Sequence, residues 1–198
     1  MVQKFGLAID FETSGFTVPK TPGNISEYAS KHQGLSFGAL IYSVDTLLPV
    51  ESMYFEMKFN KKYTWDNGAQ AVHGMSEKYL EAKGVTQEHA AFELAKLIFT
   101  WCGDKNLLVL GHRPYFDISF LDQLMSTVDL QLHYDPIKID SAAFGLTFLG
   151  VAHSNELFET VGLPARGTHN ALEDITYTLT AVRKMRDKLF DGLLQSGF

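Results

Sequence analysis

The apolar residues of this chain change their spacing about halfway along it. In the first half, runs rich in aromatic and aliphatic side chains predict three β-strands, at Gln3–Asp10, Leu35–Val44 and Glu51–Phe59. The short, turn-like link Asp45–Pro49 predicts that the strands beside it are antiparallel neighbours. The segment Thr17–Gly34, which contains prolines and glycines, is expected to be a surface loop. The first half therefore predicts a meander of strands.

The second half of the chain combines helical spacing with short apolar runs. Apolar residues three and four positions apart predict helices over Thr86–Trp101, from Pro114 to about Val128, and from Asn170 to about Phe190. Runs too short for helices predict strands at Leu107–Leu110 and Ile137–Asp140. A meander followed by alternating helices and strands predicts a mixed α/β sheet with helical layers.

The size and composition of the chain predict one packed domain and exclude several classes of protein. Its 198 residues, 45% hydrophobic and 20% charged, match neither a disordered chain nor a protein with the ~18-residue apolar run of a membrane span. The segment Met1–Asp10 is expected to be a strand rather than a secretion signal. Cys102 is the single cysteine, so no intrachain disulfide can form, and a reducing cytoplasm is the expected location.

Acidic residues stand at the ends of three predicted elements. Asp10 and Glu12 end the first strand, and because residues two apart on a strand point to the same face, both carboxylates can share one hard cation. Asp117 lies in the first turn of the helix after the fourth strand, and Asp174 lies near the start of the last helix. His169 precedes Asp174 by five residues, about 140° out of phase on a regular helix, so we expect it on the preceding loop.

Four carboxylates and one mobile imidazole suit hydrolysis with two metal ions. Cations roughly 3.5 to 4 Å apart can activate a water and neutralise the charge that builds on a phosphorus. Oxygen ligands without a cysteine cluster favour Mg²⁺ or Mn²⁺ over zinc, and leave the imidazole for proton transfer. The net charge of −6 argues against binding nucleic acid through bulk positive charge, but it suits a protein that holds cations. Taken singly, each of these residues is more often structural, and only the joint pattern indicates a site.

Three segments resemble the motifs of a known enzyme family. Residues 7–15 (LAIDFETSG), 111–121 (GHRPYFDISFL) and 167–174 (GTHNALED) are similar, in that order, to the motifs of the DEDDh exonucleases, the DnaQ-like 3′-to-5′ exonucleases. The resemblance spans nearly the whole chain. It implies an α/β, ribonuclease H-like fold with a mixed five-stranded sheet flanked by helices, and a single exonuclease domain over residues 1–198.

The resemblance also implies a role for each polar residue of the set. Asp10, Glu12, Asp117 and Asp174 would bind two divalent cations, Mg²⁺ or Mn²⁺, and Asp10 would bridge both. His169 would be the general base that deprotonates the attacking water. The products would be nucleoside 5′-monophosphates, released from a 3′ end.

Residues beside the motifs are candidates for contact with the substrate. The segment Ala71–Met75 resembles the Val-His-Gly segment with which proofreading members line the terminal nucleotide. His73 would either touch the substrate or be a turn histidine before a Ser76 helix cap. Phe16 is the better candidate for stacking on an unpaired base, whereas Phe11 is expected to pack under the strand. The expected substrate contacts are Thr13, Ser14, Phe16, His73 and Met75.

One position departs from the pattern of the family. Members commonly carry asparagine after the histidine of the second motif, and here Arg113 follows His112. Arg113 would either contact a phosphate of the substrate or pair with a surface carboxylate. The catalytic assignment depends on neither explanation.

These observations predict a metal-dependent 3′-to-5′ exonuclease that acts on single-stranded or frayed DNA ends. The alternatives are an RNA-trimming exoribonuclease with the same residues, and a catalytically silent member that binds nucleic acid or serves as a scaffold. A complete set of polar residues favours an enzyme, while the contact that would distinguish DNA from RNA at the 2′-hydroxyl has no readable signal. Nucleic acid is the expected partner, with no membrane association, in a stand-alone enzyme whose assembly into a homodimer is left open.

Overall fold

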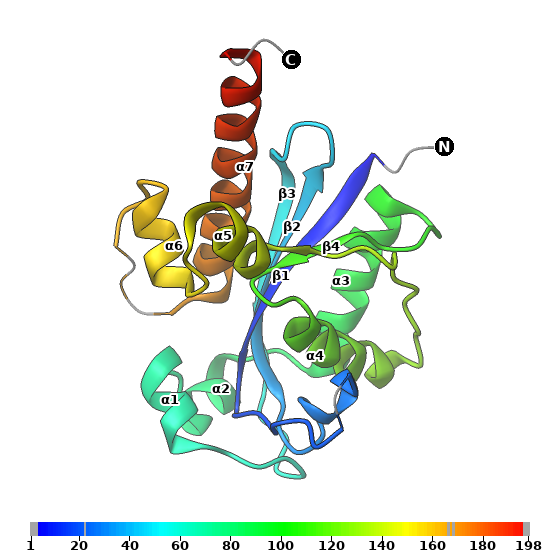
Figure 1. The fold of residues 1–198 in the computed structure, drawn as a ribbon. Coiled ribbons are helices and arrows are strands. Elements are labelled where there is room, and N and C mark those ends of the chain that lie inside the picture. Colours follow the sequence, from blue (N-terminus) through cyan, green and yellow to red (C-terminus); the bar gives the residue numbers. More distant parts are fainter. Residues whose placement is uncertain (1–3, 22, 166, 168, 196–198) are drawn as a thin grey trace.

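A five-stranded mixed sheet forms the centre of the molecule. The computed structural model describes residues 4–21, 23–165, 167 and 169–195. The strand order is β3-β2-β1-β4-β5, with antiparallel pairing among the first three strands and parallel pairing of β1, β4 and β5 (Figure 1). The strands are β1 (Phe5–Thr13), β2 (Gly34–Ser43), β3 (Pro49–Glu56), β4 (Val109–Gly111) and β5 (Ile139–Asp140). The expected mixed sheet is therefore present.

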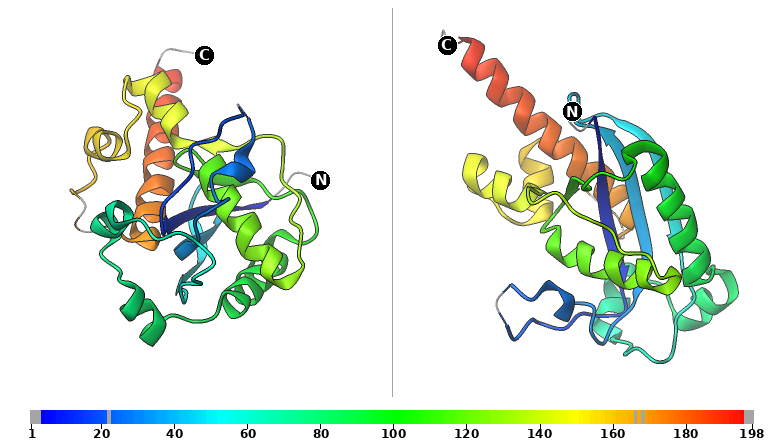
Figure 2. Two further views of the ribbon diagram at one scale, coloured as in Figure 1. Left: turned by 90° about the horizontal axis from the view of Figure 1, so that it is seen from below. Right: turned by 90° about the vertical axis from the view of Figure 1, so that its right-hand side faces the viewer.

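Helices cover both faces of this sheet. α3 and α4 lie on one face, and α7 lies with α5 and α6 on the other (Figures 1 and 2). The helices are α1 (Asn67–His73), α2 (Glu77–Lys83), α3 (Gln87–Cys102), α4 (Tyr115–Met125), α5 (Ser141–Leu149), α6 (Ser154–Thr160) and α7 (Ala171–Gln195). The neighbours Leu7 and Ala8 of β1 enter opposite cores, because successive strand residues point to opposite faces. Among the described residues, no helix is both long and apolar enough to cross a membrane.

Several predicted strands are present with shifted ends. β1 continues beyond Asp10 to Thr13, while Gln3 lies outside the described residues. β3 ends at Glu56 rather than Phe59, since the next residue leaves the strand for an isolated bridge with the segment before α3. The last strand has only its final two predicted residues, because the Ile137 N–H donates to the side chain of Asp135 in a local turn instead of pairing with β4. At the other end, the Asp140 side chain accepts the Ala142 N–H at the start of α5.

The predicted helices are all present, and further ones join them. Thr86 caps α3 as expected, by accepting the His89 N–H. The helix expected from Pro114 to about Val128 is α-helical to Met125 and ends in a 3-10 turn. α7 continues past the expected end to Gln195. Helices α1, α5 and α6 were not predicted individually.

A glycine in β2 lets α7 approach the sheet. A β-carbon on Gly38 would come within 2.3 Å of the backbone of Leu172, in the first turn of α7. Gly38 pairs with Asp10 of β1 across the antiparallel ladder. The close approach therefore sets the start of the last helix directly beside the acidic end of the first strand.

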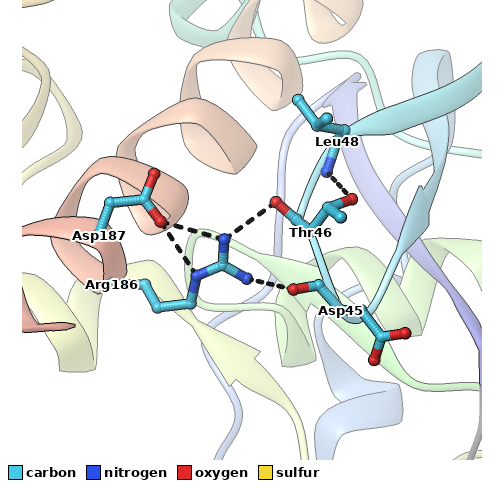
Figure 3. A network of polar contacts seen from close by, with 5 residues as sticks. All are labelled: Asp45, Thr46, Leu48, Arg186 and Asp187. Carbon is cyan, nitrogen blue, oxygen red and sulfur yellow. Dashed lines mark hydrogen bonds and ion pairs between the residues drawn. The ribbon is translucent and has the colours of Figure 1, made fainter.

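An arginine fastens the far half of α7 to the β2–β3 turn. The Arg186 guanidinium donates hydrogen bonds to the backbone carbonyls of Asp45 and Thr46, at 2.9 and 3.0 Å, and pairs with Asp187 (Figure 3). Gly38 sets the position of α7 at its start, and the hydrogen bonds of Arg186 hold the helix against the β2–β3 turn further along. The direction of α7 across the sheet is fixed by both contacts.

Candidate active site

Two carboxylates project from the end of β1. Asp10 and Glu12 share a face of β1 with Ala8, which packs in the core against α7, and both line one cavity with Asp174 of that helix. Phe11 lies between them and points to the opposite face, where its ring is 5.7 Å from that of Phe37 and only 5% of the residue is exposed. The expected packing of Phe11 under the strand is confirmed.

Asp117 comes from the first turn of α4 and is buried. Its Oδ1 accepts the backbone N–H of Phe11 at 2.9 Å, so this carboxylate holds the strand end that carries Asp10 and Glu12. Burial, and to a smaller degree the charge of Glu12, raises the pKa of Asp117 well above its ordinary range. Asp117 therefore sits in a place where a nearby cation would strongly favour its ionised form.

His169 and Asp174 meet at the start of α7. His169 lies on the preceding loop, as expected, and its Nδ1 is 3.1 Å from Oδ2 of Asp174. Asn170 between them caps the helix, because its side-chain oxygen accepts the N–H groups of Leu172 and Glu173. The cap turns the chain so that two residues out of phase on a helix come into contact.

The polar residues of three distant segments converge at one point. Ligand atoms of Glu12, His169 and Asp174 all lie within 4.8 Å of one another. A small cavity of about 160 Å³ opens there, with Asp10 in its wall. Asp117 does not line the cavity but lies close enough to Glu12 for their charges to interact. The structure thus brings all five expected catalytic residues into one neighbourhood.

Four lining residues of the cavity were missed by sequence reasoning. They are His112, Ser154, Phe158 and Thr178. Thr178 follows Asp174 by one helical turn, so the spacing could have indicated that both share a face. His112 belongs to the second motif, but the resemblance to the family assigned it no role. Ser154 and Phe158 come from α6, a seven-residue helix that carried no usable signal.

The donor set of this site fits divalent cations. Carboxylate oxygens dominate it, and hard cations such as Mg²⁺ and Mn²⁺ prefer these ligands. Several carboxylates close together, three of them buried, repel one another when ionised. Positive charge placed among them would offset this repulsion, so the residues present fit the metal ions that the resemblance implies.

The expected substrate residues near the end of β1 differ in their exposure. Phe16 is 57% exposed and contacts the ring of Phe116 edge-on, at 5.9 Å between centroids. Thr13 is mostly buried, beside an irregularity in the β1–β2 ladder. Ser14 is buried, and its hydroxyl donates to the Thr64 carbonyl and accepts the N–H of Gln33. Of these three, Phe16 has the surface that base stacking requires.

The other two expected substrate residues follow one another in the α1–α2 corner. His73 ends α1 with 7% of its surface exposed, and its Nδ1 accepts the N–H of Met75 at 3.1 Å. Burial lowers the pKa of His73, whose ring lies beside the Thr13 backbone. Met75 is buried, and Ser76 caps α2. His73 thus occupies the turn before the cap, next to the end of β1.

The sequence of this chain as a whole matches one family of enzymes. The family model of RNase_T, described as exonuclease, matches residues 7–182. This chain belongs to that exonuclease family. The expected membership among DnaQ-like exonucleases and the assignment as a nuclease are thereby confirmed. No curated protein sequence gives a significant match to this exonuclease.

Solved structures of other exonucleases share the fold of this RNase_T exonuclease. Escherichia coli exonuclease I, in a zinc-bound complex with single-stranded DNA, superposes with a TM-score of 0.71 at 18% identity, covering 98% of this chain and 43% of that one. A 3′-exonuclease that recognises the 3′ end of a histone mRNA stem-loop gives 0.66 at 14% identity, covering 95% and 84%. These likenesses confirm the ribonuclease H-like fold. This exonuclease spans less than half the length of exonuclease I.

Proposed function

We propose that this protein is a metal-dependent 3′-to-5′ exonuclease that removes nucleoside 5′-monophosphates from single-stranded or frayed DNA ends. The observation that carries the proposal is the meeting of Glu12, His169 and Asp174 within 4.8 Å, from opposite ends of the chain. Carboxylates at a shared cavity with one partly exposed imidazole are the groups that two-metal phosphodiester hydrolysis needs. A silent binding module has no use for the complete set.

In this proposal Asp10, Glu12, Asp117 and Asp174 would hold two divalent cations, Mg²⁺ or Mn²⁺. Bound there, the ions would activate water and neutralise the charge that develops on the scissile phosphate. His169 takes the proton of the attacking water. Its Nδ1 faces Asp174, so the ring is oriented by a carboxylate, and Nε2 is the nitrogen left for proton transfer.

Single-stranded DNA is the proposed substrate. Phe16 supports this choice, because its exposed ring can stack on an unpaired base, which is worth about 1 to 3 kcal/mol. The net charge of −6 gives little positive surface for gripping a duplex. We propose that Phe16 and His73 line the terminal nucleotide together with Thr13 and Met75, while Ser14 holds the loops around it. The complexes of E. coli exonuclease I with single-stranded DNA give this choice support from the fold.

RNA is the alternative substrate. The 3′-exonuclease that recognises a histone mRNA stem-loop shares the fold over most of its length, so the fold itself does not select the sugar. The discriminating contact would be one to the 2′-hydroxyl.

The test is degradation of oligonucleotides labelled at the 3′ or the 5′ end, single-stranded and duplex, as DNA and as RNA, with magnesium or with excess chelator. We expect mononucleotides from the 3′ end of single-stranded DNA in magnesium, and no products in chelator. The matched control is Asp10→Ala, purified in parallel to exclude a contaminating nuclease. If RNA is degraded faster than DNA, the protein is an exoribonuclease instead. Full activity in excess chelator would overturn the metal mechanism.

We also propose that residues 1–198 act as one exonuclease domain in a reducing compartment such as the cytoplasm. The two apolar cores share β1, which supports a single cooperative unit. Sedimentation of the purified protein would decide between a monomer and a homodimer. A single thermal unfolding transition is expected, and two separate transitions would contradict the single domain.

A further inference from the structure

Arg113 adopts a backbone conformation that arginine disfavours. Its φ angle is +60°, in the left-handed region where the β-carbon of an L residue crowds the following carbonyl group. Asparagine tolerates this region better than arginine does. The turn is imposed by the protein: the Arg113 N–H donates to Oδ1 of Asp140 at 3.0 Å, and the same oxygen accepts the N–H of Ala142.

The charge of Arg113 is also unfavourably placed for stability. It directly precedes Pro114, the N-cap of α4, so a positive group stands at the positive end of a helix dipole. The side chain is exposed, and among the described residues none accepts a hydrogen bond or ion pair from its guanidinium. The described part of the chain therefore gives no support to an ion pair between Arg113 and a surface carboxylate. Neither the backbone nor the folded surroundings account for an arginine at this position.

The position lies at the rim of the carboxylate cavity. His112, the preceding residue, lines that cavity, and its Nδ1 is 2.9 Å from the Ser141 hydroxyl. Arg113 itself is not among the lining residues. Arg113 thus places a positive charge beside an acidic cavity, although its φ angle and its position before α4 both disfavour it. Such a charge is suited to binding an anionic group that lies at the rim of the cavity.

We propose that Arg113 binds a backbone phosphate of the single strand, upstream of the terminal nucleotide. The inference rests on the proposed function, which sets the scissile phosphate at the carboxylates and leaves a neighbouring phosphate for the rim. A guanidinium can donate two parallel hydrogen bonds to phosphate oxygens. On a protein of net charge −6, this cation also offsets the repulsion that the strand meets near the acidic cavity.

The experiment compares Arg113→Asn with wild type in two assays. Fluorescence anisotropy in excess chelator measures the binding of labelled oligothymidylate and oligouridylate over a series of salt concentrations, independently of hydrolysis. Steady-state kinetics in magnesium compare an oligothymidylate with the p-nitrophenyl ester of thymidine 5′-monophosphate, which has only the scissile phosphate. The matched control is Lys105→Asn, the same charge change on an exposed residue before the opposite end of β4.

We expect Arg113→Asn to bind both oligonucleotides roughly tenfold more weakly and to lower the slope of log affinity against log salt by about 0.7, the loss of one phosphate contact on a single strand. Its KM for the oligonucleotide should rise while cleavage of the small ester stays unchanged. Its melting temperature should equal or exceed that of wild type, because asparagine relieves the backbone strain. Lys105→Asn should match wild type in each assay.

Two results would overturn the inference. If Arg113→Asn binds with unchanged affinity and an unchanged salt slope, Arg113 does not contact a phosphate. Equal losses on the oligonucleotide and the small ester would place Arg113 on the scissile phosphate instead. A wild-type protein that binds oligonucleotides with the expected Arg113 dependence but hydrolyses none would refute the proposed function alone.

Discussion

At the scale of single residues, the acidic groups of the site act as a set. Asp117 shows this most clearly, because its burial and the charge of Glu12 both oppose its ionisation. Carboxylates this close together repel one another when both are ionised, and a shared cation would offset that repulsion. The loss of one member should therefore harm hydrolysis far more than folding.

We predict that Asp10→Ala or Asp174→Ala reduces hydrolysis to background while the protein stays folded. Removing one ligand disrupts the two-ion geometry and also relieves repulsion between carboxylates. The melting temperature in chelator should be unchanged or higher, measured by circular dichroism beside a turnover assay in magnesium. Near-wild-type turnover in either variant would contradict the assignment.

We predict that His169→Ala lowers turnover by roughly 100- to 10,000-fold, the usual contribution of a general base. The ring is partly exposed and held by Asp174 rather than built into the core, so folding should not change. Magnesium should still raise the melting temperature of the variant. Lost metal stabilisation with a normal rate would show that His169 is a ligand and not a base.

We predict that Cys102 is unreactive in the folded protein. Burial raises the pKa of its thiol to about 11, so the reactive thiolate is scarce at neutral pH. An aromatic disulfide reagent should release its chromophore only after denaturant is added. Immediate reaction of native protein would mean that the α3 end opens readily, and Cys102→Ser should abolish the signal in either case.

At the scale of elements, the site depends on how closely α7 approaches β2. Gly38 permits this approach, since a side chain there would collide with the backbone of Leu172. The first turn of the helix carries Asp174, so any outward shift of α7 moves this carboxylate away from β1.

We predict that Gly38→Ala destabilises the protein by about 1 to 3 kcal/mol and lowers turnover by about 100-fold, as a shift of about 1 Å at a catalytic group would. The matched control is Gly192→Ala in the same helix, where a β-carbon meets open space. That change should stabilise the protein by about 0.5 to 1 kcal/mol without a loss of rate. Normal turnover in Gly38→Ala would show that α7 can adjust. Urea titrations and oligonucleotide kinetics measure both effects.

Sequence reasoning succeeded where the signal is local and strongly periodic. The alternation of side chains along a strand was enough to predict that Phe11 and the two carboxylates around it point to opposite faces. The helical phase between His169 and Asp174 was enough to predict that His169 lies on a loop. It failed where side-chain hydrogen bonds set the end of an element, as at the start of β5, where the side chain of Asp135 accepts the Ile137 N–H. It also missed Ser154 and Phe158, because a short helix that packs against the site has no period of its own.

At the scale of the whole molecule, metal binding and folding should be linked. A ligand that binds only the folded state stabilises it by about 2.7 kcal/mol at a hundredfold excess over its dissociation constant. For a domain of this size, about 2 to 4 °C accompany each kcal/mol. We predict that saturating magnesium or manganese raises the melting temperature of wild type by roughly 5 to 10 °C, and leaves the Asp10→Ala, Asp174→Ala double variant unchanged. An equal rise in both proteins would locate the ions elsewhere.

The site joins residues from opposite ends of the chain, with Asp10 and Glu12 on the first strand and His169 and Asp174 at the last helix. A ribosome that has made only residues 1–150 has produced the strand carboxylates and Asp117, but neither His169 nor Asp174. A nascent chain of that length therefore lacks part of the residue set that the proposed hydrolysis needs. The complete site forms only after α7 has been synthesised and packs beside Gly38, so under the proposed function a nascent chain gains its hydrolytic activity after this helix is in place.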